Sequence, residues 1–93
     1  LALPTIATCN TLFGQRCRLV DALSLPDLSF EIRDKDDQDF TDPTQPFPGD
    51  NNHSPAIECL PDGRLRAAYV DESGDLVYAE SWNDGDTWQE VTS

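Results

Sequence analysis

The chain has 93 residues, with six lysines and arginines against 18 acidic residues and a formal net charge of −12 at pH 7. This charge excludes nucleic acid as a partner, because phosphate contacts need a basic face, and it excludes adhesion to an anionic membrane surface. No apolar run approaches the roughly 18 residues of a membrane span, so we expect no membrane insertion. Because the sequence contains no methionine, we expect it to be a piece of a longer polypeptide.

The first forty residues favour β-strands. Residues 18–25 have a pattern that a short helix could share, but the internal repeat described below favours a strand there. The acidic run that follows places carboxylate oxygens at alternate positions, and such ligands suit calcium. The candidate ligands are Asp34, Asp36, Asp37 and Asp39. The run lacks the glycine and the glutamate of a calcium-binding EF-hand loop. A solvated loop between strands is therefore the alternative, and no cofactor is expected.

Residues 41–53 predict a loop between two units. The segment contains three prolines, which lack the N–H donor that a central strand requires. The last forty residues then alternate short apolar runs with turn clusters of Asp, Asn, Gly and Pro. This spacing is typical of an antiparallel meander of four strands, with runs at 55–60, 65–70, 76–81 and 87–91.

The two halves of the chain match each other when one is shifted by about 50 residues. The matches follow the same order in both halves and pair Pro4 with Pro55, Val20 with Val70, Leu28 with Leu76, and Phe40 with Trp88. We therefore predict two copies of one four-stranded unit. A degenerate first copy spans residues 1–40, a second copy spans residues 54–93, and residues 41–53 connect them.

Residues 81–88 read SWNDGDTW and resemble the Asp-box of the bacterial-neuraminidase (BNR) repeat, S-x-D-x-G-x-T-W. The residues that carry the resemblance are Ser81, Asn83, Gly85, Thr87 and Trp88. Asn83 stands where the family usually has aspartate, and an asparagine side chain can make the same bond to the turn backbone. In that family the Asp-box is structural and lies on the rim, so the resemblance implies a folding role for these five residues. It covers residues 55–93 clearly and 4–40 faintly.

The resemblance implies an all-β fold made of two consecutive four-stranded antiparallel blades of a sialidase-like β-propeller. Two blades form an incomplete ring, because propellers typically have four to eight. The remaining blades are expected on the rest of a longer polypeptide or on other protein subunits. Self-association is the alternative, in which three two-blade chains would close a six-blade ring.

The function implied is that of a non-catalytic binding or structural module. It would belong to a larger surface or phage-tail-type protein, extracellular or in a virion, that contacts glycans or neighbouring subunits. One alternative is a fragment of a sialidase or related glycoside hydrolase with its active residues outside this segment. Another is a small lectin that closes a propeller by trimerisation.

Candidate ligand contacts are few. Sialidases resemble one another at an aromatic-Arg-Ile-Pro motif whose arginine grips the substrate carboxylate, and His53 stands at the arginine position here. Because histidine cannot replace a bidentate arginine, we expect no complete sialidase site and no catalytic residue. His53 stays a candidate for contact with a polar ligand, with a solvated loop histidine as the alternative. The rings of Trp82 and Phe47 are candidates for stacking on a sugar.

Three cysteines are present: Cys9, Cys17 and Cys59. A zinc site would need a fourth ligand and no C-x-x-C pair occurs, so no metal is expected on them. Small buried free thiols are one interpretation, and one disulfide with a leftover thiol is the other.

Overall fold

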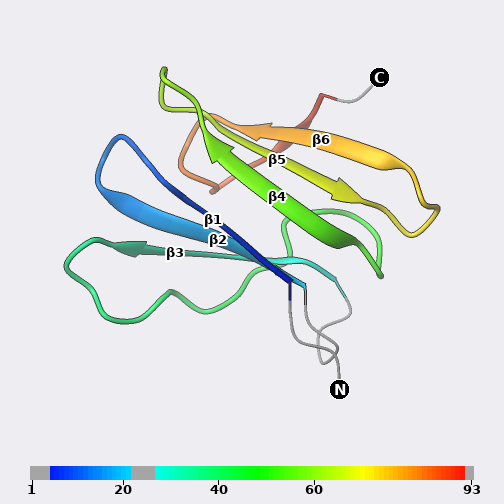
Figure 1. Ribbon diagram of the computed structural model, residues 1–93, viewed down its shortest axis with the longest axis horizontal. Helices are drawn as coiled ribbons and strands as arrows, with labels where there is room; N and C mark the ends of the chain where they lie inside the picture. Colours follow the sequence, from blue (N-terminus) through cyan, green and yellow to red (C-terminus); the bar gives the residue numbers. More distant parts are fainter. Residues whose placement is uncertain (1–4, 22–26, 92–93) are drawn as a thin grey trace.

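The computed structural model describes residues 5–21 and 27–91, and within them the chain forms two antiparallel β-sheets (Figure 1). The N-terminal sheet has the order β1-β2-β3, with β1 at Thr5–Asn10, β2 at Gln15–Asp21 and β3 at Ser29–Asp34. The C-terminal sheet has the order β4-β5-β6-β7, with β4 at His53–Cys59, β5 at Leu65–Val70, β6 at Leu76–Ser81 and β7 at Gln89–Glu90. The predicted all-β class is confirmed.

The four-stranded meander predicted for the second half is present, with strands close to their predicted bounds. Residues 18–21 lie in β2, so the short helix considered there does not form, and residues 22–26 lie outside the described residues. No helix in the described ranges is long and apolar enough to cross a membrane.

The prediction of four strands in the first unit is wrong. After β3 the chain turns at Asp34. Further pairing on that edge in the described part consists of an isolated bridge between Phe30 and Thr44 and a backbone hydrogen bond from the Thr41 N–H to the Ile32 carbonyl at 3.0 Å. Aspartates are depleted in strands, and four of them follow one another closely here. Arg33 instead closes the acidic segment into a loop, because its Nη1 donates to the carbonyl oxygens of Asp37 and Gln38 at 3.1 and 3.2 Å.

Phe40, which the repeat aligned with Trp88, therefore lies in a loop and not in a strand. Its ring lies under two guanidinium groups on the outward face of the N-terminal sheet. The Cζ atom of Arg18 is 4.0 Å from the ring centroid, and that of Arg33 is 5.0 Å from it. The ring thus stabilises the acidic loop against the outside of β2 and β3.

The hairpin turns share one pattern of hydrogen bonds, which the turn between β5 and β6 also makes through Asp71 and Gly74. Between β1 and β2 the Thr11 N–H donates to the Gln15 carbonyl at 2.8 Å, and the N–H of Gly14 donates back to the Thr11 carbonyl. Between β4 and β5 the N–H of Leu60 and that of Gly63 make the same two bonds. The glycines have φ of 79° and 93°, a conformation that glycine adopts without the steric cost of a Cβ.

The core lies between the two sheets. Alternate residues of each strand face it, as expected for strands with one buried face. The buried apolar side chains come from both sheets and the loops beside them: Cys17, Leu19, Leu28, Phe30, Phe47, Leu65, Ala67, Tyr69, Val77 and Ala79. Both halves of the described chain therefore share one core.

The sheets approach most closely through their first strands. β1 and β2 both contact β4, whereas β3 and β6 make no backbone approach to each other. Figure 1 shows β1 beside β4, with β3 and β6 on opposite sides of the molecule. The two sheets therefore diverge from their first strands outward, and side chains must fill the wedge between them.

Candidate functional site

The turn between β6 and β7 holds the five residues that resemble an Asp-box in one hydrogen-bonded loop. The Ser81 side chain is fully buried, and its Oγ accepts from the Gly85 N–H at 2.7 Å. The same hydroxyl donates to the Asn83 Oδ1 at 3.0 Å, and this oxygen also accepts from the Thr87 N–H at 2.9 Å. The Trp88 indole closes the loop, because its Nε1 donates to the Gly85 carbonyl at 3.1 Å. The side chains thus satisfy the backbone groups that the turn leaves without strand partners.

Asn83 makes a bond that an aspartate could not make. Its Nδ2 donates to the Thr87 Oγ1 at 2.9 Å, while its Oδ1 accepts from the Thr87 backbone. A carboxylate has only acceptors, so the threonine hydroxyl would have to donate instead. The amide of Asn83 is therefore compatible with this turn, at the position where the Asp-box motif has an aspartate.

Gly85 brings the turn against the other sheet. Its φ is 87°, and a Cβ built on it would overlap the ring of Phe30 from β3. The Phe30 ring also meets the Trp88 ring edge to face, with 5.5 Å between centroids and 74° between planes. Close approach and positive φ both require glycine here. The turn at Gly85 in the C-terminal sheet therefore packs on the N-terminal sheet.

Phe47 belongs to the same aromatic cluster. Its side chain is 5% exposed, and its ring centroid lies 4.5 Å from that of Tyr69 and 5.3 Å from that of Trp88. A ring buried between two others has no free face for a sugar. The expectation that Phe47 contacts a ligand is corrected: this residue fills the wedge between the sheets.

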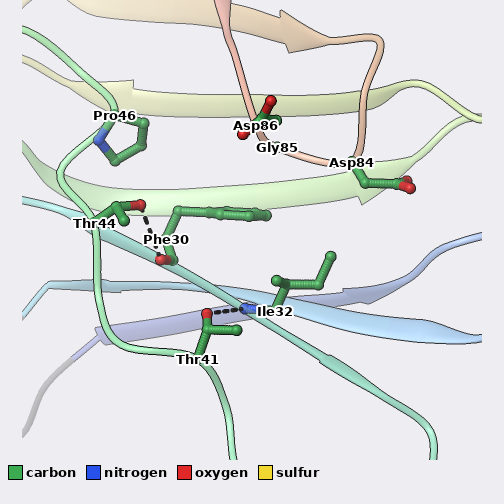
Figure 2. A pocket seen from close by; sticks show the side chains of 8 residues that line it. All are labelled: Phe30, Ile32, Thr41, Thr44, Pro46, Asp84, Gly85 and Asp86. Atoms are coloured by element: carbon green, nitrogen blue, oxygen red, sulfur yellow. Dashed lines mark hydrogen bonds between the residues drawn. The ribbon is translucent and has the colours of Figure 1, made fainter.

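An open hollow of about 330 Å³ lies outside this cluster (Figure 2). Figure 2 shows Thr41, Thr44 and Pro46 of the connecting loop on one side and the Asp-box turn on the other. The Thr44 hydroxyl donates to the Phe30 carbonyl at 3.3 Å, and the Thr41 hydroxyl accepts from the Ile32 N–H at 3.2 Å. Both hydroxyls therefore anchor the loop to β3.

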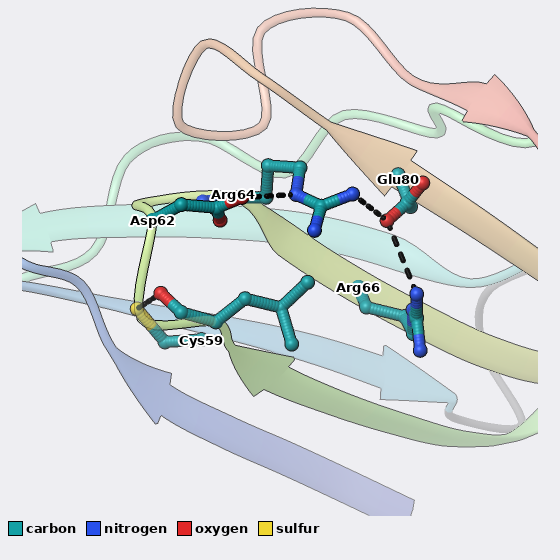
Figure 3. Close-up of polar contacts among 6 residues, drawn as sticks. Cys59, Asp62, Arg64, Arg66 and Glu80 are labelled. Carbon is teal, nitrogen blue, oxygen red and sulfur yellow. Dashed lines mark hydrogen bonds and ion pairs between the residues drawn. The ribbon is translucent and has the colours of Figure 1, made fainter.

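Charged groups gather at the other side of the C-terminal sheet (Figure 3). Glu80 is 8% exposed, and its Oε2 lies 2.8 Å from the Arg64 Nη1 and 3.3 Å from the Arg66 Nη2. Two arginines compensate this buried carboxylate, which would otherwise be costly to bury. Arg64 also hydrogen bonds to Asp62 and so holds the pKa of that carboxyl below its usual value.

Trp82 lies beside this cluster. Its side chain is 67% exposed, and the Arg64 Cζ lies 4.7 Å from its ring centroid. His53 is exposed as the first residue of β4, with its Nδ1 3.0 Å from the Ser54 Oγ. Strands β4 and β6 run in the same direction, because each is antiparallel to β5. His53 lies at the start of β4, and Trp82 lies just after the end of β6. The two candidates are therefore roughly 20 Å apart at opposite ends of the sheet.

The calcium ligands weighed from the sequence do not converge. All four aspartates are exposed: Asp34, Asp36, Asp37 and Asp39. The Asp34 carboxylate accepts from the Gln15 Nε2 at 3.0 Å. In the part of the chain that the structure describes, no three His, Cys, Asp or Glu side chains are gathered so that they could hold a metal ion.

Phe30 is the residue of this region that sequence reasoning missed. The repeat aligned its segment with that of Tyr78, but Phe30 is buried in the core whereas Tyr78 is 41% exposed on the outward face, so the two aligned positions are not equivalent. No pattern in the sequence indicates that Phe30 meets Gly85, because these residues lie far apart along the chain and on different sheets. The motif indicates a glycine at this turn, but the contact with Phe30 appears only in the folded structure.

We predict that Gly85→Ala lowers the free energy of unfolding more than Gly74→Ala. Both glycines have φ of 87°, but a Cβ on Gly74 meets nothing within 4 Å, whereas one on Gly85 overlaps Phe30. The Gly74 variant therefore loses about 1–2 kcal/mol from the left-handed backbone alone. The Gly85 variant loses roughly 1–3 kcal/mol more, because the ring must move. Urea unfolding followed by tryptophan fluorescence measures both, and equal losses would contradict the contact.

The chain matches no protein-family model, and a search of curated proteins finds no match. The likeness of residues 81–88 to the Asp-box therefore rests on the motif itself and on the hydrogen bonds that its residues make.

Proposed function

We propose that this chain is a non-catalytic structural and binding module, formed by two consecutive blades of an incomplete sialidase-like propeller. Its outward sheet faces pack against further blades or neighbouring subunits of a larger surface or virion protein. The observation that carries the proposal is an uncovered apolar row that crosses the C-terminal sheet on the face away from the core.

The relation between the sheets supports the blade assignment. In both sheets the strand order follows the chain, and the first strands β1 and β4 lie together while the later strands diverge. Blades that ring a central axis share this geometry, because their first strands line the axis.

The apolar row is built by strand register. Ala56 pairs with Ala68, Ala68 pairs with Tyr78, and the Val91 N–H donates to the Tyr78 carbonyl at 2.8 Å. Val91 is 46% exposed, and Leu76 on the same face is 51% exposed. The two alanines are small, and an open hollow of about 240 Å³ lies over them. An apolar row with a hollow is a surface on which side chains of another sheet can seat.

The row beside it is ionic. Glu58 pairs with Arg66, and Arg66 pairs with Glu80, so this row carries both signs of charge within the sheet. A partner sheet would need polar side chains over the ionic row and apolar ones over the alanines. The proposed partner is therefore a second half-buried sheet, in which apolar and polar residues alternate along each strand. The same module would serve in a glycoside hydrolase with its active residues elsewhere, or in a trimeric lectin.

We expect the 93-residue chain to associate in solution, and we expect Ala68→Glu to suppress this association. The substitution places a carboxylate in the apolar row, where a packed sheet would have to desolvate it. Ser73→Glu is the matched control, because it adds the same charge on an exposed turn. Light scattering over a concentration series measures the mass of each variant, and circular dichroism checks that each is folded.

A discrete trimer of the wild-type chain would favour ring closure by self-association, whereas open-ended assemblies would favour a segment of a longer propeller. A wild-type chain that stays monomeric at every concentration would contradict packing through this face. Equal association of the Ala68→Glu and Ser73→Glu variants would also contradict it.

Contact with a glycan is a second candidate function, and Trp82 favours it. The ring is largely exposed, with the polar groups of Arg64 and Asp62 beside it. An aromatic face with hydrogen-bonding groups at its edge suits a sugar ring, which has apolar and hydroxyl surfaces. The net charge of −12 disfavours an acidic sugar, so the candidate ligand is a neutral oligosaccharide.

Binding to a panel of immobilised neutral oligosaccharides tests this second candidate. Trp82→Ala is expected to remove the signal of the wild-type chain, since it deletes the stacking surface. Phe13→Ala is the control, because Phe13 is 75% exposed on the turn between β1 and β2 of the other sheet. Binding that survives in the Trp82 variant, or that disappears equally in both, would exclude a sugar site at Trp82.

A further inference from the structure

The three cysteines gather where the two sheets meet. Cys9 in β1 is the direct register partner of Cys17 in β2. Cys59 ends β4, the strand against which β1 packs. Cys17 is fully buried, whereas Cys9 and Cys59 are partly buried and pack on the same core. All three are free thiols in the structure.

The hairpin places Cys9 and Cys17 within reach of a disulfide. The Thr11 N–H donates to the Gln15 carbonyl, so by the alternation of an antiparallel ladder Cys9 and Cys17 form a hydrogen-bonded pair. Such pairs have Cα atoms about 5.5 Å apart, and disulfides span Cα separations of about 4.4–6.8 Å. Both side chains face the core side of the sheet. The Cβ atoms of directly opposite residues lie about 4.5–5.5 Å apart, with hydrogen-bonded pairs at the wider end, whereas a disulfide needs about 3.5–4.5 Å. Bridging them therefore needs side-chain rotation and a local approach of the two strands, without a change of register.

The two thiols of this pair differ in acidity. The Cys17 thiol hydrogen bonds to Cys9 and lowers the pKa of Cys9 from its ordinary value. The same bond, together with burial, raises the pKa of Cys17. Burial also raises the pKa of Cys59, and the nearby Cys9 adds to this effect. Cys9 is thus the thiol of the three that most readily becomes a thiolate, which is the nucleophilic form.

We propose that Cys9 and Cys17 form a redox modification site, in which Cys9 reacts with a hydroperoxide and Cys17 converts the product to a cross-strand disulfide. The Cys9 thiolate attacks the terminal oxygen of the hydroperoxide and the O–O bond breaks, giving a sulfenic acid and an alkoxide, or hydroxide where the oxidant is hydrogen peroxide. The Cys17 sulfur then attacks the Cys9 sulfur. The S–O bond breaks, and the hydroxyl leaves as water with the proton of Cys17. The two sulfurs lose two electrons, which the peroxide takes up.

Cys59 is left out of this reaction by its position. It is not a register partner of either thiol, and its Sγ donates to the Leu60 carbonyl at 3.8 Å (Figure 3). The proposal therefore names one product among the three disulfides that three cysteines could form. This disulfide joins neighbouring strands of one hairpin and makes no covalent link between the two sheets.

Peptide mapping after treatment with hydrogen peroxide tests the proposal on the intact chain. The remaining thiols are blocked by alkylation, and trypsin then separates the cysteines, because cleavage after Arg16, Arg18, Lys35 and Arg64 leaves them in peptides 1–16, 17–18 and 36–64. The expected product is peptide 1–16 linked to 17–18, with 36–64 alkylated. Oxidation of Cys9 is expected to be at least about tenfold faster than that of Cys59, since rates follow thiolate character and access.

Variants and denaturation supply the controls. Cys59→Ser is expected to form the same disulfide at an unchanged rate. Cys17→Ser and Cys17→Ala are expected to stop at the Cys9 sulfenic acid, which dimedone traps. In urea the three thiols should lose their differences in rate. A main product that contains Cys59, or a folded wild-type chain whose thiols react at the rates seen in urea, would overturn the proposal whether or not the variants fold.

Discussion

The contact between the Gly85 turn and the Phe30 ring is the constraint on which the rest of the structure depends. The two sheets meet through β1 and β4 and diverge toward β3 and β6, so the wedge between them must be filled. Phe30, Phe47 and Trp88 fill it, and the ring of Phe30 can reach Trp88 only because the turn has no side chain at Gly85. A turn whose hydrogen bonds are all local thus also holds two sheets together.

In this acidic chain, most of the basic residues contact an acidic side chain or an aromatic ring. Glu80 is buried and is compensated by Arg64 and Arg66, while Glu31 pairs with Arg18 on the other sheet. Four of the six basic residues therefore serve in ion pairs or lie over Phe40. Large apolar side chains are exposed in the row on the outward face of the C-terminal sheet, at Trp82, and on the N-terminal hairpin at Leu12 and Phe13. Because an exposed apolar row marks an interaction surface, the row on the C-terminal sheet, and not a charged patch, is the interface that we propose for the module.

The strands of the second half could be predicted because alternating apolar residues and glycine turns specify them locally. The fourth strand of the first half could not, because the repeat aligned Phe40 with Trp88 although the acidic run has no counterpart of Gly85 or Thr87. Arg33 captures that run as a loop instead. Phe47 looked like an exposed loop aromatic, because its neighbours are prolines and polar residues. Its burial depends on Tyr69 and Trp88, which no local pattern connects to it.

A double-mutant cycle on Phe30→Ala and Trp88→Ala tests the central contact most directly. The free energies of unfolding of the wild-type chain, the two single variants and the double variant give the coupling between rings on different sheets. An edge-to-face pair is worth about 0.5–1.5 kcal/mol beyond the area it buries, and the account predicts a coupling in that range. Losses that add within about 0.3 kcal/mol would mean that the rings do not meet, and the joint between the sheets would lie elsewhere.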